Sequence, residues 1–287
     1  MSTEDAFNTA LRISLENTEV FPPSPWTNQD GLVSLLEECQ EDDDVELVKE
    51  LIGKLNNNIA DEIKTNDLLF KMAETIGRNE IPGDETALSV MRVKGDTKSD
   101  GSQSIIDLLK VPLEIKANFK YGYCTTTFNE IQSLYTKGYR HFIVVDDFIG
   151  SGKTAFRRYY DFSCWKLEGA TIHFYFLAGM AKAMSFCRNW TIPADCFKVM
   201  HKEISGYYSG KELLKRVWAM ERLENKLGRL SGNVKLKDCA FGYNHAEALF
   251  CRKFGNIPNN VFPIFWWNKC SDGKSRIPIF RRVQDGY

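Results

Sequence analysis

A short apolar run at 142–145 consists of Phe142, Ile143 and two valines. A short β-branched run of this kind is typical of a strand buried on both faces of a parallel sheet. Asp146 and Asp147 follow and are predicted to end the strand. A glycine-rich loop comes next, then a helix at about 155–167 and a second apolar strand at 170–178. This order predicts a βαβ unit.

The rest of the hydrophobic pattern predicts an α/β fold. Apolar residues at helical spacing indicate helices at 31–39, 45–55, 59–76, 105–110, 181–190 and 211–230, and one that starts after 125–127 and ends near 137. Strands are expected at 84–93 and 196–204, and a strand or hairpin at 112–123. We therefore predict a mainly parallel central sheet flanked by helices, at 81–287, with a helical N-terminal extension at 1–80.

Composition narrows the class of protein. The 287 residues are 43% hydrophobic and carry a formal charge of −1, which argues against a nucleic-acid or membrane footprint over the whole surface. No apolar run reaches the length of a membrane span, and the polar start is not a signal peptide. The eight cysteines form no C-x-x-C pair, so we expect reduced thiols, no zinc site and a cytoplasmic protein.

The segment from Asp146 to Thr154 is the best candidate for chemistry. Glycines allow backbone N–H groups to crowd around an anion, and the start of the following helix adds donors and a favourable dipole. The two carboxylates suit the hydroxyls of a sugar. A nucleotide P-loop is an alternative, but its pattern requires glycine at the position of Asp147. In the plainest alternative, the acids only cap the strand and the helix.

The run IVVDDFIGSGKT resembles the ribose-5-phosphate loop of type I phosphoribosyltransferases. The resemblance implies a phosphoribosyltransferase-type sheet, with Asp146 and Asp147 on the ribose hydroxyls. It departs from the family's usual pattern by a glycine in place of threonine at 150 and a lysine in place of glycine at 153. The residues implied on the 5′-phosphate are Ile149, Gly150, Ser151, Gly152, Lys153 and Thr154.

The polar loop at 94–102 follows the first predicted strand, where the same family approaches pyrophosphate. The resemblance implies this role for Lys94 with Gly95, and for Lys98 or Ser102. An ordinary solvated turn is the alternative. His173 is expected on the face of the second strand, not in catalysis, whereas His201 and Lys202 lie near a strand end and are weaker site candidates.

The region at 241–267 is the second informative segment. It contains a glycine, an aromatic, Asn and His before a predicted helix, then a Pro-Asn-Asn turn and an aromatic run. Together with the central loop and the Trp26–Asp30 leader, it is similar to the phosphoribosyltransferase-like effector domain of bacterial conflict and anti-phage systems. The resemblance implies a base or acceptor pocket, whose candidate residues are Tyr243, His245, Asn259, Asn260 and Trp266.

The resemblance also implies an activity. Chemistry at the ribose C1 of phosphoribosyl pyrophosphate or a nucleotide is expected, with Mg²⁺ bound through substrate oxygens and not directly by protein ligands. The implied role is a defence effector restrained by regulatory protein partners. Two other readings stay open: a non-catalytic nucleotide sensor that keeps the ribose-phosphate pocket, and a structural adaptor. A nucleic-acid target is also left open: the 211–230 helix carries basic residues that could form such a surface, although glutamates interrupt them.

Overall fold

The computed structural model describes residues 2–21, 28–79, 81–95, 101–253 and 255–282. The chain divides into two compact units, which are described one at a time. The sheet unit is residues 62–200, and the terminal unit joins residues 1–61 to residues 201–287. This division places the helix at 62–78 with the sheet, whereas the boundary near residue 80 stays a prediction.

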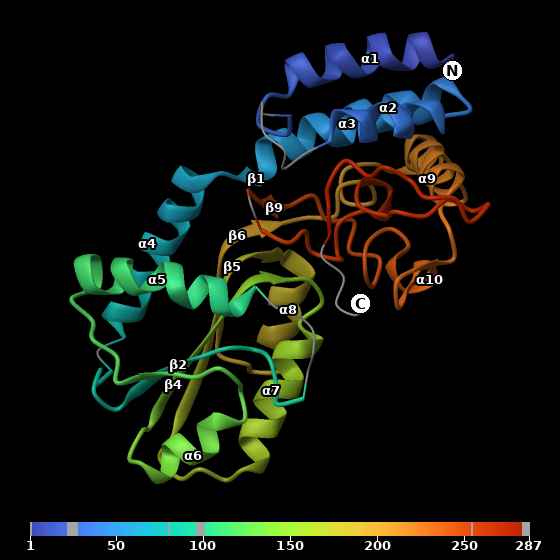
Figure 1. Ribbon diagram of the computed structural model, residues 1–287. Coiled ribbons are helices and arrows are strands. Elements are labelled where there is room, and N and C mark those ends of the chain that lie inside the picture. The colour runs from blue at the N-terminus through green and yellow to red at the C-terminus, as the bar shows by residue number, and fades with distance from the viewer. Residues whose placement is uncertain (1, 22–27, 80, 96–100, 254, 283–287) are drawn as a thin grey trace. The chain divides into compact units, whose positions relative to one another are not determined.

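The sheet unit is built on five parallel strands in the order β3-β2-β4-β5-β6 (Figure 1). This confirms the predicted α/β fold class with a parallel sheet flanked by helices. Its strands are β2 (Thr86–Ser89), β3 (Tyr123–Cys124), β4 (His141–Ile149), β5 (Thr171–Met180) and β6 (Ala194–Met200). Its helices are α4 (Glu62–Arg78), α5 (Ser102–Ala117), α6 (Glu130–Thr136), α7 (Lys153–Cys164) and α8 (Ala181–Asn189).

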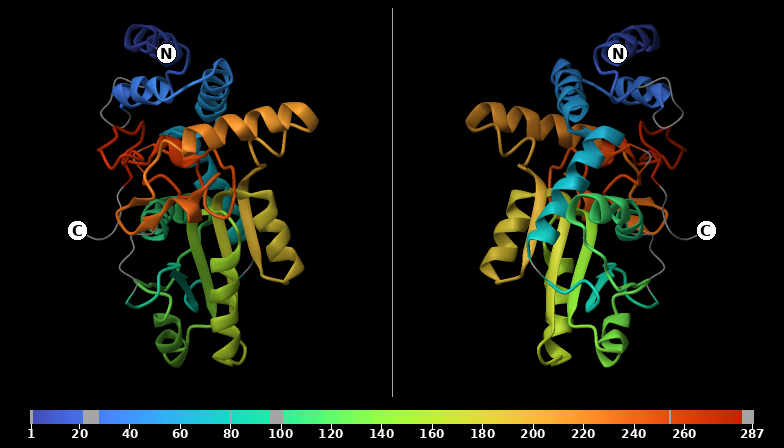
Figure 2. Two further views of the ribbon diagram at one scale, coloured as in Figure 1. Left: turned by 90° about the vertical axis from the view of Figure 1, so that its right-hand side faces the viewer. Right: turned by 90° about the vertical axis from the view of Figure 1, so that its left-hand side faces the viewer.

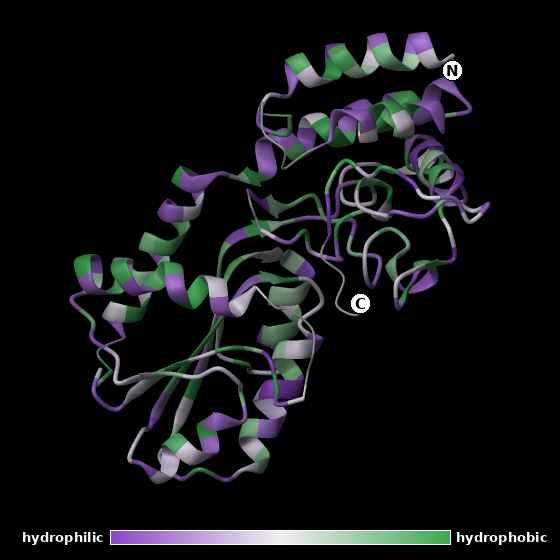
Figure 3. Ribbon diagram, viewed as in Figure 1, coloured by the Kyte–Doolittle hydropathy of each residue, from purple (hydrophilic) through white to green (hydrophobic). Residues whose placement is uncertain are grey.

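Helices cover both faces of this sheet (Figure 2). On one face, α4 and α5 pack against each other and bury apolar side chains such as Leu69 and Ile106 against Ile143 and Tyr175 of the strands. On the other face, α7 and α8 contact β5 and β6. The colouring of Figure 3 shows how strongly apolar residues are concentrated in these strands. The burial of both faces explains why β4 and β5 are apolar runs and not alternating patterns.

Two predicted elements of the sheet unit were wrong. The strand or hairpin expected at 112–123 is mostly helix, because α5 continues through Pro112 to Ala117 and only Tyr123–Cys124 is strand. Pro112 is tolerated inside the helix because its ring lies on the buried face with Leu109 and Leu113. The acids were expected to end β4, but its pairing with β5 continues through Asp146 to Ile149.

The terminal unit has its long helices before residue 59 and at 210–224, and its described residues after 224 are mostly irregular. Helices α3 and α9 pack together through ion pairs, with Arg216 against Glu50 at 2.9 Å and Arg222 against Asp44 at 2.7 Å. The longer elements are α1 (Thr3–Glu16), α2 (Gln29–Glu37), α3 (Asp42–Asn58) and α9 (Gly210–Glu224). The short ones are β1 (Ile59–Ala60), β7 (Leu230–Ser231), β8 (Val234–Lys235), α10 (Leu236–Cys239), β9 (Cys251–Arg252) and a 3-10 turn (Pro263–Phe265).

In the described parts of the chain, no helix combines the length and the hydropathy that crossing a bilayer would require.

Candidate functional site

The order of the strands marks a place in the sheet where a ligand would be expected. The chain passes from β2 outward to β3 and then returns to the other side of β2 to form β4. In open parallel sheets, ligands bind outside the carboxyl ends of the strands where the winding reverses in this way. The loops that follow β2 and β4 therefore flank the expected site, and they contain the predicted pyrophosphate and phosphate segments.

Asp146 and Asp147 are half-buried near the carboxyl end of β4. The backbone N–H of Asp147 donates to Oδ1 of Asp146 at 2.9 Å. The buried Ser102 donates its hydroxyl to the same Oδ1 at 3.4 Å and accepts the backbone N–H of Met91 at 3.2 Å. One serine at the start of α5 thus joins the acid pair to the loop after β2.

Gly101, directly before α5, approaches the carboxylate of Asp147 closely. A Cβ atom built on Gly101 would collide with the carboxylate carbon and both of its oxygens. A larger residue at this position would displace the carboxylate of Asp147, so glycine lets the start of α5 lie against the acid pair as it stands. Sequence reasoning missed Gly101; the signal was a Gly-Ser pair directly before a predicted helix.

The loop after β4 leads directly into the start of α7. Gly152 adopts a left-handed φ of 78° and is the residue from which α7 starts. A Cβ atom on it would lie 2.8 Å from Cδ1 of Phe186, so both conformation and space require glycine. Lys153 and Thr154 are exposed in the first turn of α7. The first N–H groups of a helix have no acceptor within the helix and attract anions.

The loop after β2 is fixed from two sides. The N–H of Met91 is held by Ser102, and its carbonyl accepts Nε of Arg158 at 2.7 Å. Arg158 comes from α7, so the helix that starts at the phosphate loop also anchors the loop after β2. Further along, the N–H of Lys94 donates to Oδ1 of Asn129 at 2.9 Å. Sequence reasoning gave Arg158 no role, because the contact joins residues 67 positions apart.

The predicted pyrophosphate-loop residues are placed in part. Lys94 and Gly95 are exposed, and Gly95 has a left-handed φ of 86°. Lys98 lies outside the described residues. The role of these residues on pyrophosphate stays a prediction.

The predicted base-pocket residues belong to the terminal unit. Tyr243 donates its N–H to the carbonyl of Asn259 at 2.9 Å, and the side-chain amide of Asn260 donates to the carbonyl of Tyr243 at 3.1 Å. His245 is exposed on the same loop. Trp266 is buried and donates Nε1 to the carbonyl of Val261 at 3.0 Å. The structure thus joins the 243 and 259–260 segments, and the pocket role of all five residues stays a prediction.

Three further residues were considered from the sequence: His173, His201 and Lys202. His173 lies on the face of β5, where its ring stacks on Tyr175 at 4.4 Å and its Nε2 lies 2.8 Å from Asp195. Lys202 pairs with Glu247 at 2.9 Å, and His201 is exposed. Among the described residues, no group of three or more His, Cys, Asp or Glu side chains has the arrangement to hold a metal ion.

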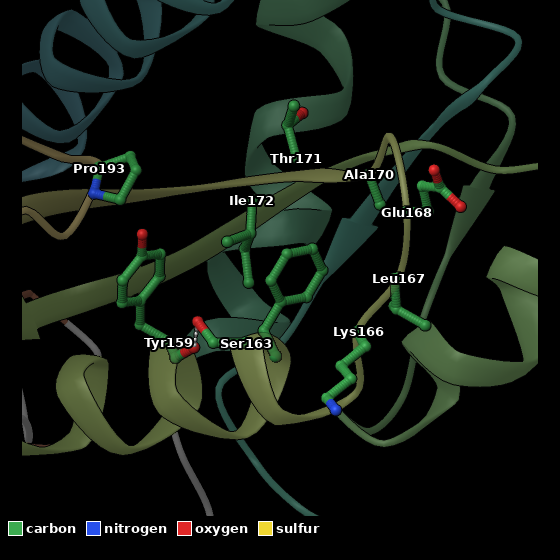
Figure 4. Close-up of a pocket in the computed structure, with 10 residues that line it drawn as sticks. Tyr159, Ser163, Lys166, Leu167, Glu168, Ala170, Thr171, Ile172 and Pro193 are labelled. Atoms are coloured by element: carbon green, nitrogen blue, oxygen red, sulfur yellow. Dashed lines mark hydrogen bonds between the residues drawn. The ribbon is translucent and has the colours of Figure 1, made fainter.

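A hollow in the sheet unit lies away from the acid pair. It measures about 500 Å³ and is formed by the end of α7, the turn after it and the start of β5, as the positions of Tyr159, Ser163 and Ile172 in Figure 4 show. The candidate site is instead an open edge of the sheet. We place the candidate chemistry at the acid pair because the switch point and the glycine loop both meet there.

A five-stranded parallel sheet with an acid pair and a glycine loop at its switch point defines a phosphoribosyltransferase-like protein. The sequence profile of the PRTase-CE family matches residues 39–282, which is most of the chain. The chain therefore belongs to the PRTase-CE family. No curated protein matches it.

Solved structures resemble about half of the chain. A hypoxanthine-guanine-xanthine phosphoribosyltransferase is 16% identical, with a TM-score of 0.33, over 51% of this chain and 82% of its own. The xanthine-guanine-hypoxanthine phosphoribosyltransferase of Helicobacter pylori is 12% identical, with a TM-score of 0.32, over 50% of this chain and 84% of its own. A hypothetical protein from Neisseria gonorrhoeae with bound ppGpp is 15% identical, with a TM-score of 0.32, over 50% and 84%.

Proposed function

We propose that this protein acts at the ribose C1 of phosphoribosyl pyrophosphate or of a nucleotide. The observation that carries the proposal is the joining of three parts at the switch point: the acid pair, the glycine loop at the start of α7, and the loop after β2. Ser102 and Arg158 hold these parts together. The arrangement provides anion donors at one end and hydroxyl acceptors at the other, as a ribose phosphate requires.

The residues have distinct roles in this proposal. The carboxylates of Asp146 and Asp147 accept the 2′- and 3′-hydroxyls and favour the positive charge that develops on the ring as the bond at C1 breaks. The N–H groups of Gly152–Thr154 hold the 5′-phosphate at the start of α7. Catalysis then comes mainly from fixing the sugar relative to its leaving group and acceptor.

Mg²⁺ fits this site as a companion of the substrate. Its preferred ligands are oxygens at octahedral geometry, and it retains several waters. The pyrophosphate oxygens and water would be its direct ligands. The carboxylates of the acid pair would lie next to this shell without contacting the metal ion. We propose no direct ligation by the protein.

The test is calorimetric titration of the full chain with phosphoribosyl pyrophosphate, with and without Mg²⁺. We expect saturable binding that Asp147→Asn weakens by about a hundredfold and that Asp107→Asn, a change at an exposed position of α5, leaves unchanged. Failure of the folded wild-type chain to bind either phosphoribosyl pyrophosphate or a nucleotide would sink the proposal. Binding without release of pyrophosphate or base, across a panel of acceptors, would favour the non-catalytic sensor.

The biological role that we propose is a defence effector restrained by regulatory protein partners, in the cytoplasm. It is supported by the sequence resemblance of the central loop and of the 241–267 segment. Expression of the wild-type chain without partners should arrest bacterial growth, and Asp147→Asn should abolish the arrest. Equal arrest by both chains would contradict a role that depends on this site.

A further inference from the structure

A second hollow, of about 370 Å³, lies at the amino-terminal ends of β4 and β5, whereas the acid pair lies near the carboxyl end of β4. Ile143 and Tyr175 lie beneath α4 and α5, and His141 and His173 precede them by two residues on the same sheet face. This amino-terminal part of the face borders the hollow. Asp146 follows Ile143 by three residues, roughly 10 Å along the strand, and alternation places it on the other face of the sheet from Ile143 and His173, so the hollow is separate from the acid pair. Its lining is Asn79, Ile81, His141, Phe142, Ile143, Thr171, Ile172, His173, Tyr175 and Pro193.

The ring of His173 is fixed in orientation and tautomer. It stacks on Tyr175 with centroids 4.4 Å apart and planes at 19°, and Tyr175 stacks in turn on Phe197 with planes at 13°. Its Nε2 lies 2.8 Å from Oδ2 of Asp195. A carboxylate only accepts hydrogen bonds, so Nε2 carries a proton, and in the neutral form of the ring Nδ1 is an acceptor. The side chain keeps 34% of its surface exposed, so a ligand has access to it.

The other polar groups of the hollow belong to His141, Thr171, Tyr175 and Asn79. Nδ1 of His141 and Oγ1 of Thr171 are 2.9 Å apart, and the hydroxyl of Tyr175 accepts the side-chain amide of Asn79 at 2.6 Å. The described residues of the lining include no lysine or arginine. The nearby carboxylate of Asp195 repels anions as well. This chemistry excludes a phosphate and suits a neutral ligand with both donors and acceptors on a flat ring.

We propose that this hollow is a second small-molecule site, which takes a planar nitrogen heterocycle without phosphate: a nucleobase or a nucleoside. The ring stacks beside His173 as the next member of the series of parallel rings, and a ring N–H donates to Nδ1 of His173. The imidazole of His141 and the hydroxyl of Thr171 contact the edge of the ligand. The volume lies within the range of about 300–1,000 Å³ that small-molecule sites occupy. The proposal does not depend on the function proposed for the acid pair.

The experiment is calorimetric titration of the full chain with adenosine, guanosine, cytidine and uridine. We expect at least one to bind saturably, and His173→Ala to weaken that binding at least tenfold. Asp195→Ala should weaken it too, because the ring of His173 loses its partner. The matched control is Asp272→Ala, since these two acids have side chains 47% and 51% exposed and Asp272 is in the terminal unit.

A further variant locates the binding. Asp147→Asn should leave nucleoside binding unchanged, and a loss in that variant would place the nucleoside at the acid pair and overturn the proposal. Binding of none of the four nucleosides, or binding that His173→Ala leaves at the wild-type level, would also overturn it. If circular dichroism shows that His173→Ala is unfolded, His173→Phe decides the matter: it keeps the ring stack, removes the acceptor and should weaken binding at least threefold.

Discussion

Carboxylates occur in two contrasting settings in this protein. Asp146 and Asp147 are half-buried at the carboxyl edge of a regular sheet. Glu224 and Glu247 of the terminal unit are 6% and 5% exposed. Glu247 accepts hydrogen bonds from the N–H groups of residues 204 and 205, the hydroxyl of Ser205 and the ammonium of Lys202. The contrast separates acids placed where a ligand can reach them from acids that hold an irregular fold together.

The two buried glutamates also differ from each other. Burial alone would raise the pKa of Glu247, but the hydrogen bonds from Lys202 and Ser205 outweigh it, so its pKa is lowered. Burial raises the pKa of Glu224 to about 8, because the N–H of Phe241 offsets little of the desolvation. Glu247 is therefore a charged anchor, and Glu224 is a neutral acid at ordinary pH.

The largest expected effect is the change in folding stability with pH that Glu224 causes. A carboxyl with a raised pKa holds its proton in the folded state while the unfolded chain is ionised, so stability falls as pH rises from about 4.5 to about 8. The loss over that window is on the order of 4 kcal/mol. Glu224→Gln keeps the acceptor for Phe241 and should remove this loss. Urea unfolding at pH 5, 6.5 and 8, followed by tryptophan fluorescence, measures it.

The control for this experiment is Glu212→Gln, an exposed acid on the same helix. It should keep the wild-type pH dependence. A wild-type slope in Glu224→Gln would show that another group causes the pH dependence.

The second effect is the stability that Glu247 contributes. Glu247→Ala leaves Lys202 and Ser205 without their acceptor inside the fold, and we expect a loss of about 3 kcal/mol in the free energy of unfolding. Glu212→Ala, at an exposed position of α9, should change it by less than about 0.5 kcal/mol. Equal stability of the two variants would show that Glu247 does not anchor the fold.

The third prediction concerns Asp147, where we expect a large effect on ligand binding and a small effect on stability. Asp147→Asn should weaken the binding of phosphoribosyl pyrophosphate about a hundredfold, which is about 2.7 kcal/mol, because the hydroxyls lose a charged acceptor. Its melting temperature should stay within about 3 °C of the wild type, since the acid is half-buried. A collapse of the fold with no specific effect on binding would make Asp147 an anchor like Glu247.

The smallest effect separates two costs of an added side chain: the cost of a left-handed backbone and the cost of a steric clash. Gly152→Ala meets both a left-handed φ and the ring of Phe186, so we expect a loss of about 2 kcal/mol. Gly169 has a φ of 71° with no atom within 4 Å of an added Cβ, so Gly169→Ala should cost about 1 kcal/mol from conformation alone. Thermal melts of both variants give the difference. Equal losses would show that Phe186 moves aside.

The sequence determined the elements that depend on neighbouring residues. The apolar run at 142–145 and the glycines at 150 and 152 are sufficient to predict β4, the loop and α7, because burial on both faces and a left-handed residue are local requirements. The sequence placed Tyr243, Asn259 and Asn260 in one candidate pocket, but it did not predict the hydrogen bonds between them. The helix through Pro112 was missed, because burial against α4 outweighed the local preference of proline.

Only the tertiary structure decided how the site is assembled. The order of the strands places the loops after β2 and β4 side by side, and no local pattern specifies that order. The same holds for Ser102 and Arg158, which fix Met91 from α5 and α7, and for Gly101 against Asp147. These contacts join residues 11 to 67 positions apart, so they exist only once the helices have packed on the sheet. The residue types follow from the sequence, whereas their meeting follows from the fold.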